Sequence, residues 1–562
     1  MSVGLICALV ACAAAVWASM AHLDLIVSGF VIGALLCGVL VDNGVARVVA
    51  LPPAPGRKVD WLPLPLRFIQ NGYKLARHAI HHVLRLSEQS RCLDLWTELG
   101  VIALRETLDS TLTWSMTQAQ QEGLRGCLLL DNMWTSPCSI PVPAESAILK
   151  ILKLAIMQLP ACSWMAPCWD DWEMPKPSPV ECEWIGFCKG PKLQHGLSPS
   201  QSYAQMMEEV TSDTVVLYFH GGAYYGGGEP ASRRMARDLA QRTGGRVLTI
   251  ECRHAPENPF PAALMDAFGA YLYLLHPCDG ALHSPVEPWN VVLAGHGAGA
   301  HLALGLMKIL HQMNRGKSFP PRIQWNKRRC YLFKPAGLAM ISPWVDITRS
   351  SPSWNDEETG KWDYFPSLDH QIAQGEQRPP CHLWPTNPPR THPLCDDHWL
   401  FHPLVTPILD CQWKDFPPVY ICHGQERVAD EIRFFALERL RWCGVDVTLE
   451  EYQAMPSCFP IRFPHLKQSR RCVGSMAAFI TKVTAERPDP DRLKFKIPHS
   501  CAVLIQAPSA DVVKRDFTAE DLGTRSRREM EEDMSVAVLK RGFPLKYSPF
   551  PPDISIWGIV LA

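Results

Sequence analysis

Short apolar runs separated by segments of helical periodicity constrain the fold of this chain more than any other feature. The runs span residues 213–222, 245–252, 290–295, 337–342, 417–424 and 445–452. Such apolar runs are typical of strands that are covered on both faces. The segments with helical spacing are 231–242, 260–275, 298–313 and 430–444. This alternation predicts an α/β fold with a mostly parallel central sheet and helices on both faces.

The N-terminal 50 residues differ from the rest and predict a membrane anchor. Residues 3–21 and 25–41 contain no charged side chain, and each is near the ~20 residues needed to cross a bilayer. A signal peptide is the alternative for the first segment, although a basic start is absent. Lys and Arg occur only after the second segment, so the positive-inside rule predicts that most of the chain is cytosolic. We expect residues 1–50 to form one or two transmembrane helices in the endoplasmic reticulum or another internal membrane.

The remaining chain divides into three predicted parts. Residues 51–179 start with the Pro-rich linker "LPPAPGRK" and continue as a helical cap, with two to four helices expected between 62 and 125. Residues 180–482 form the α/β domain. An irregular insert at 346–412, rich in Pro, Trp and His, is placed where it can form a lid over a pocket. Residues 483–562 contain a charged helix at about 517–540 and a tail, to which the sequence assigns no role.

Charge and cysteine usage exclude some function classes. The net charge is −1 and no basic stripe is present, which argues against nucleic-acid binding. We expect the 21 cysteines to be mainly free, buried thiols. A few disulfides are the alternative, if part of the chain faces an oxidising compartment. His78, His81 and His82 share one predicted helix without an acidic partner, so we do not expect them to bind a metal ion. We also expect no other metal ion and no cofactor in this chain.

Four ordered motifs follow the predicted strands and carry a family resemblance. They are "HGGAYYGG" (220–227), "RHAPENPFPAALMD" (253–266), "AGHGAGAHLAL" (294–304) and "ISPWVDIT" (341–348). In order and spacing they resemble the hormone-sensitive-lipase branch of the α/β-hydrolases, whose motifs are H-G-G-G, Y-R-L-A-P-E-x-P-F-P-A-A-x-x-D and G-D-S-A-G-G. The resemblance covers about 180–482 and extends to membrane-anchored esterases and steryl acetyl hydrolases of fungal type. It implies an α/β-hydrolase fold of the carboxylic-ester hydrolase class.

The resemblance places the nucleophile elbow at Gly295-His296-Gly297-Ala298-Gly299. Gly297 stands where the family has its serine, so the nucleophilic hydroxyl is missing. His296 replaces the aspartate that normally precedes the serine. Glycine tolerates the strained elbow conformation freely, and the substitution therefore removes the chemistry without straining the turn.

The same resemblance assigns an oxyanion hole to the motif that begins at His220. Backbone N–H groups of Gly221 and Gly222, with that of Ala298, are the expected donors. Such donors stabilise the negative charge that develops on the substrate oxygen, and each is worth about 100–1,000-fold in rate.

Of the two remaining catalytic positions, one keeps an acidic residue and the other lacks the histidine of the family. Glu426 falls at the position of the acid and Asp430 matches a second acid of the motif; an alternative is that Glu426 is a solvated loop charge. Ser457 stands at the position of the histidine, and a hydroxyl cannot act as a general base near neutral pH. His465, eight residues further on, is a conceivable substitute, although an ordinary surface histidine is the simpler interpretation.

The sequence therefore predicts a pseudoenzyme that keeps the pocket and the oxyanion loop and binds a lipid, a lipophilic ester or a sterol-like ligand at a membrane. One alternative is an active ester hydrolase or deacetylase of lipophilic substrates that uses Cys458 or Ser457 as a non-standard nucleophile. Another is a structural membrane protein whose pocket has closed.

Overall fold

The structure is a computed structural model that describes most of the α/β domain and part of the cap. The described residues are 74–123, 132–142, 147–159, 174–190, 196–226, 230–317, 319–326, 328–373, 379–486, 501–507, 509 and 512–514. None of the helices in these ranges has both the length and the apolar character required to cross a bilayer. The predicted anchor segments 3–21 and 25–41 and the predicted helix at 517–540 lie outside the described residues.

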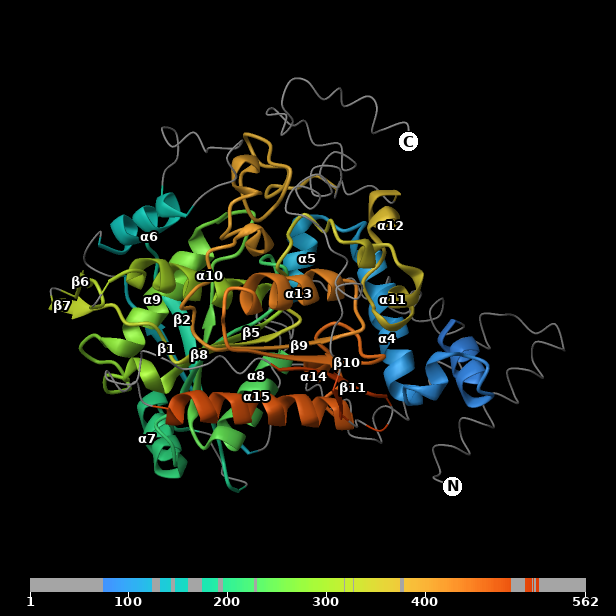
Figure 1. Ribbon diagram of the computed structural model, residues 1–562, viewed down its shortest axis with the longest axis horizontal. Helices are drawn as coiled ribbons and strands as arrows, with labels where there is room; N and C mark the ends of the chain where they lie inside the picture. Colours follow the sequence, from blue (N-terminus) through green and yellow to red (C-terminus); the bar gives the residue numbers. More distant parts are fainter. Residues whose placement is uncertain are drawn as a thin grey trace.

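A large mixed sheet forms the centre of the molecule (Figure 1). Its order is β1-β2-β4-β3-β5-β8-β9-β10-β11-β12, and all neighbours from β4 to β11 are parallel. The strands are β1 (Met133–Ile140), β2 (Val180–Phe187), β3 (Val215–Phe219), β4 (Arg246–Glu251), β5 (Val291–His296), β8 (Gly337–Ile341), β9 (Val419–Gly424), β10 (Val447–Tyr452), β11 (Cys501–Ile505) and β12 (Val512–Lys514). A separate hairpin joins β6 (Arg322–Trp325) to β7 (Arg328–Tyr331).

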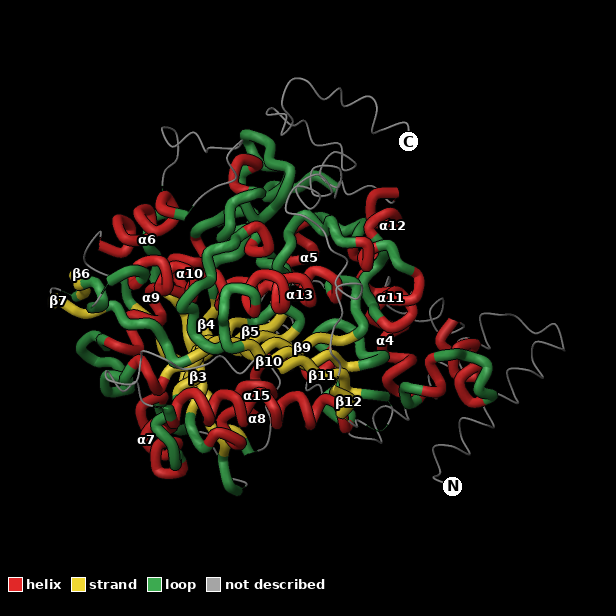
Figure 2. The backbone as a smooth tube through the Cα atoms, in the orientation of Figure 1, coloured by secondary structure: helices red, strands yellow, loops and turns green. Residues whose placement is uncertain are grey.

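The helices cover both faces of this sheet. They are α4 (Leu95–Thr111), α5 (Met116–Gly123), α6 (Ala147–Gln158), α7 (Pro199–Glu209), α8 (Pro230–Thr243), α9 (Ala262–Leu275), α10 (Ala298–Asn314), α11 (Glu357–Trp362), α12 (Leu368–Ala373), α13 (Ala429–Phe434), α14 (Phe459–Arg462) and α15 (Lys467–Ala485). Residues 74–83 are also helical, and a π-helical segment, Phe435–Arg441, continues α13. Helices α9, α10 and α13 lie on one face, and α8 and α15 on the other (Figures 1 and 2).

Strand β3 illustrates why these apolar runs become buried strands. Val215, Leu217 and Phe219 belong to the core beneath α9 and α10, whereas Val216 and Tyr218 belong to the core beneath α8 and α15. Side chains alternate across a strand, so a strand between two helical layers must be apolar at every position. The predicted α/β class with a mostly parallel, doubly covered sheet is confirmed.

The sheet extends beyond the predicted domain of residues 180–482. Strand β1 comes from the region predicted as a helical cap, and it pairs antiparallel with β2. Strand β11 comes from the C-terminal region and pairs parallel with β10. The helices in the described residues of the insert at 346–412 are short, among them α11 and α12, and its role as a lid stays a prediction.

The parallel strands bring the sequence motifs together. The carboxyl ends of β3, β4, β5, β8 and β9 lie at one edge of the sheet, because neighbouring parallel strands end on the same side. Ligands of open α/β sheets bind at this edge. The segments that follow these strands therefore form the candidate site.

Candidate active site

The nucleophile elbow is present in its strand–turn–helix form, with glycine at its centre. Strand β5 ends at His296 and α10 begins at Ala298. Between them, Gly297 has φ 54° and ψ −121°, a conformation that residues with a Cβ rarely adopt. Its N–H donates to the carbonyl oxygen of Ile341 at 3.0 Å. The backbone thus holds position 297 as an elbow, although no side chain is present to react.

A thiol lies next to the missing hydroxyl. A β-carbon added to Gly297 would lie 3.9 Å from the Cys458 Sγ, with no other described atom within 4 Å apart from its chain neighbours. The Cys458 side chain is buried, and its backbone N–H donates to the Ser342 Oγ at 2.9 Å. A β-carbon at position 297, where the family has its nucleophile, would therefore have free space around it. The nearest atom would be the Cys458 Sγ.

The acid position is retained and buried. Glu426 has no exposed surface, and its Oε2 accepts a hydrogen bond from the Ser342 Oγ at 2.9 Å. The alternative that Glu426 is a solvated loop charge is therefore wrong. Burial and the nearby Asp363 carboxylate raise the pKa of Glu426 to about 8, against the lowering effect of hydrogen bonds from Ser342 and Ser457. At neutral pH this side chain is largely a neutral carboxylic acid.

The histidine position is occupied by a buried serine that binds a carboxylate. The Ser457 Oγ donates to Asp363 Oδ2 at 2.9 Å, and the Ser457 N–H donates to Oδ1 at 3.2 Å. Asp363 directly follows α11 in the insert and is itself fully buried. No histidine hydrogen-bonds Ser457 or Glu426 among the described residues. The Asp363 carboxylate, which comes from the insert, therefore lies near Glu426, where the family has an imidazole.

Two other predicted positions lie outside this cluster. Asp430 Oδ1 accepts from Arg433 at 3.1 Å, and its Oδ2 accepts from the Ser353 N–H at 3.2 Å. His465 contacts Asp94 and Thr97 at the start of α4 through its Nε2, at 3.4 and 3.1 Å, and half of its side chain is exposed. Neither residue is hydrogen-bonded to Glu426 or Ser457, and His465 does not replace the missing histidine here.

The oxyanion loop is held by the residue that replaces the family's aspartate. The Gly221 N–H donates to the His296 Nε2 at 3.0 Å, so the ring proton lies on Nδ1, which is 2.9 Å from the Tyr218 hydroxyl. In this structure the Gly221 N–H is thus directed at His296. The roles of Gly221, Gly222 and Ala298 as oxyanion donors stay predictions.

A pocket opens beside this loop and the start of α10. Its lining combines apolar side chains with two histidines and backbone of the elbow: Phe219, His220, Gly221, Tyr224, Gly226, Ile250, Cys252, Arg253, His254, Ala298, Gly299 and Leu302. Both Gly221 and Ala298 contribute to its wall. A mostly apolar pocket with a few polar groups is the usual form of a small-molecule site.

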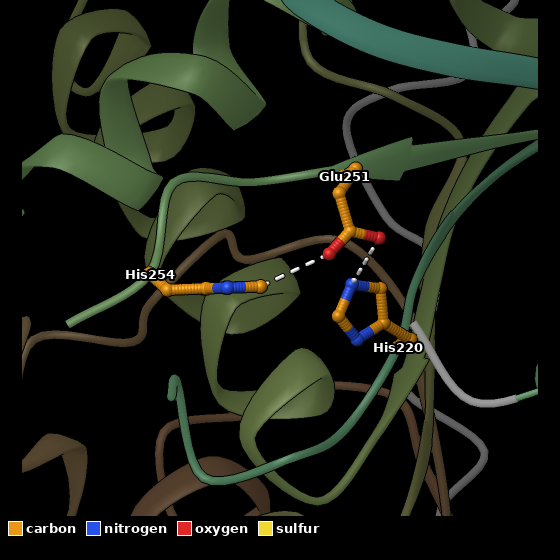
Figure 3. A group of neighbouring side chains, drawn as sticks. All are labelled: His220, Glu251 and His254. Carbon is orange, nitrogen blue, oxygen red and sulfur yellow. Dashed lines mark ion pairs between the residues drawn. The ribbon is translucent and has the colours of Figure 1, made fainter. Parts of the chain in front are cut away.

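The two histidines in the pocket lining, His220 and His254, both face the carboxylate of Glu251 (Figure 3). Glu251 lies at the end of β4, His220 follows β3, and His254 follows Glu251 by three residues. Burial alone would raise the pKa of Glu251, but the two histidines lower it to about 2. The sequence signal for this cluster is His254, which stands at the leucine of the R-L-A-P-E motif. Sequence reasoning missed the cluster because this position has no catalytic role in the family motif.

The histidines at 78, 81 and 82 form no comparable group. His82 Nδ1 lies 2.5 Å from Glu98 Oε2, so this histidine has an acidic partner on α4 that the local sequence does not reveal. Within the described residues, the group of potential metal ligands is His220, Glu251 and His254. The described cysteines are free.

Comparison with known proteins agrees with this geometry. Residues 216–461 match the family profile described as alpha/beta hydrolase fold. The chain is 29% identical to an acetyl-hydrolase of Streptomyces hygroscopicus over 272 residues, covering 48% of this chain and 76% of that protein. It is 25% identical to an esterase of Acinetobacter venetianus over 280 residues, covering 50% and 78%. A shorter match of 116 residues, 31% identical, links it to the hormone-sensitive lipase of Mus musculus, covering 21% and 14%. The fold of this chain is thus that of the α/β-hydrolases, and the proteins similar to it include an acetyl-hydrolase, an esterase and a hormone-sensitive lipase.

Proposed function

We propose that this protein binds a lipophilic ester in the hydrolase pocket without performing serine-esterase catalysis. The observation that carries the proposal is Gly297, which keeps the backbone conformation of the elbow but has no hydroxyl. No acyl-enzyme can form at a residue without a nucleophilic atom. The acetyl-hydrolase and esterase relatives support an ester as the ligand class.

The change at the histidine position also argues against serine-esterase catalysis. Ser457 donates to Asp363, and neither a hydroxyl nor an ionised carboxylate reproduces the imidazole that accepts and returns a proton near neutral pH. In a comparable triad, loss of the serine or the histidine alone lowers kcat by about 2 × 10⁶. With both positions altered, the only contributions to catalysis that remain are those of substrate binding and of the oxyanion donors.

We further propose a membrane location for this activity. The uncharged segments at 3–21 and 25–41 and the Lys and Arg residues after them support an anchor with the bulk of the chain on the cytosolic side. An internal membrane such as the endoplasmic reticulum suits this orientation. A lipophilic ester or a sterol-like ester is the ligand class that such a location would supply.

One observation favours a second candidate, an ester hydrolase that uses a cysteine. The Cys458 Sγ borders the space of the missing nucleophile, whereas the Ser457 Oγ is bonded to Asp363. Cys458 is therefore the better alternative nucleophile of the two. A thiol attacks as its thiolate and needs a base or a cation to form it, and this requirement makes the cysteine hydrolase the second candidate.

Ligand binding tests the main proposal. Thermal shifts of the full-length protein in detergent are measured with short acyl esters and sterol esters, while ester hydrolysis is followed in parallel. We expect saturable stabilisation by at least one ester and no turnover above buffer. Leu302→Trp fills the pocket and should abolish the shift, whereas Leu154→Trp, at an exposed position of α6, should retain it. Flat shifts across all esters would contradict the proposal.

A further inference from the structure

We propose that His220, Glu251 and His254 bind one divalent transition-metal ion, with zinc as the best match, on the wall of the pocket. This inference is independent of the proposed ester binding and departs from the expectation that the chain needs no metal. It rests on the geometry of the three side chains, on the hydrogen bond that orients His220 and on the residue type at position 254.

The three side chains converge at the carboxyl edge of the sheet. The His220 Nε2 lies 3.3 Å from Glu251 Oε2, and the His254 Nε2 lies 3.0 Å from Glu251 Oε1. One ligand atom from each residue lies within 4.8 Å of the others. Ligand atoms of a tetrahedral zinc site are separated by about 3.3 Å, given Zn–N and Zn–O distances of about 2.0–2.1 Å. Small rotations of the side chains are enough to close the site.

A backbone hydrogen bond orients His220 as in known metal sites. The His220 Nδ1 lies 2.6 Å from the carbonyl oxygen of Gly221. A carbonyl oxygen only accepts, so Nδ1 carries a proton, and Nε2 is the nitrogen that faces Glu251. Metal-bound histidines typically donate their other ring N–H to a carbonyl or a carboxylate in this way.

The carboxylate of Glu251 faces two imidazole nitrogens. Its Oε1 and the His254 Nε2 lie 3.0 Å apart, and both atoms are shielded from solvent. Because the Nδ1 of His220 already directs a proton to the carbonyl oxygen of Gly221, the His220 Nε2 faces the carboxylate favourably only when a second proton or a cation lies between them. A metal ion at this point would bind both histidines and the carboxylate at once.

The surroundings favour a bound cation. The nearby Arg253 guanidinium is paired with Asp266, with Nη2 2.7 Å from Oδ1, so its charge is offset. Two histidines and one glutamate form a donor set typical of catalytic zinc, in which the fourth position is left for water or substrate. Because His220 and His254 line the same pocket as Gly221 and Ala298, that position is accessible to a bound ligand.

Position 254 provides the sharpest test. His254 replaces the leucine of the family motif, so His254→Leu restores the family residue and removes one of three ligands. Full-length protein in detergent is stripped with a chelator, and Zn²⁺ binding is measured by calorimetry and by elemental analysis after dialysis. We expect one tightly held Zn²⁺ per chain, with binding weakened about 100-fold or more in His254→Leu. His382→Leu, at an exposed position of the insert, should bind as the wild type does.

Cobalt spectroscopy separates this site from binding by cysteines. Co²⁺ in the proposed site should give visible bands of nitrogen and oxygen ligation without thiolate-to-cobalt charge transfer. Circular dichroism verifies that His254→Leu is folded, and Glu251→Gln provides a second ligand variant. Equal Zn²⁺ affinity in the wild type and in both variants would overturn the proposal, as would a thiolate-type cobalt spectrum.

Discussion

The Ser457 Oγ donates a hydrogen bond of 2.9 Å to Asp363 Oδ2, and this contact joins the insert to the histidine position of the candidate site. The two residues are 94 positions apart. Asp363 also accepts from the backbone N–H of Arg427, directly after Glu426. The insert therefore does more than cover the domain, because its carboxylate takes part in the polar network at the histidine position.

Removal of this carboxylate should destabilise the fold. Asp363→Ala leaves the Ser457 hydroxyl and the Arg427 N–H without their acceptor in a buried site. We expect a loss of about 3 kcal/mol in the free energy of unfolding, measured by urea denaturation, since unsatisfied buried donors cost about 1–3 kcal/mol each. Ser457→Ala removes one donor only and should cost about 1 kcal/mol. Equal stability of Asp363→Ala and the wild type would show that this network carries no stability.

The raised pKa of Glu426 should make stability depend on pH. In the folded state this carboxyl titrates with a pKa of about 8, whereas the usual value is 4.5. The folded protein thus keeps a proton that the unfolded chain has lost between these values. The contribution to stability is full below about pH 4.5 and is lost as the pH rises through about 8, by an amount on the order of 5 kcal/mol.

Glu426→Gln cannot ionise and should therefore lose less stability between about pH 5 and about pH 9 than the wild type does. Thermal unfolding at several pH values measures the difference. Glu357→Gln, at an exposed position of α11, should follow the wild-type profile. A Glu426→Gln profile that parallels the wild type would contradict a buried, protonated carboxyl.

Restoration of the serine alone should not restore the enzyme. The β-carbon of Gly297→Ser meets no close contact, but its positive φ should cost about 1–3 kcal/mol of stability. We expect Gly297→Ser to show little hydrolysis of p-nitrophenyl butyrate and Gly297→Ser with Ser457→His to show measurable hydrolysis, because the hydroxyl needs a general base. Full activity of the single variant would mean that another residue already supplies the base.

Cys458 should react slowly because its thiol is buried. Its side chain is buried, whereas Cys411 is exposed. Peptide mass spectrometry after brief treatment with iodoacetamide should therefore find Cys458 alkylated at least about tenfold more slowly than Cys411, since reactivity follows access and thiolate content. Faster alkylation at Cys458 would instead favour the cysteine-dependent hydrolase.

The sequence predicts the elements that depend on local pattern. Apolar runs locate β3 and β5, because a strand covered on both faces must be apolar throughout. The place of Gly297 between an apolar strand and a helix identifies it as the elbow residue. Long-range contacts carry no such signal: the Asp363 carboxylate comes from an irregular insert, and its approach to Ser457 depends on how α11 packs.

The hydrogen bond between Gly221 and His296 likewise cannot be predicted from the local sequence. The motif identifies both residues, but only their packed positions show that the imidazole of His296 accepts the N–H that was assigned to the oxyanion hole. The strands β1 and β11 were missed for a related reason, since pairing with β2 and β10 recruits segments whose own composition is not decisive.

Covalent labelling tests the central claim most directly. The full-length wild type is incubated with an alkyl fluorophosphonate, which phosphonylates activated serines, and its intact mass is then measured. The account predicts an unmodified mass for the wild type and an adduct at position 297 in the double variant Gly297→Ser, Ser457→His. A stoichiometric serine adduct on the wild type, accompanied by ester turnover, would contradict it.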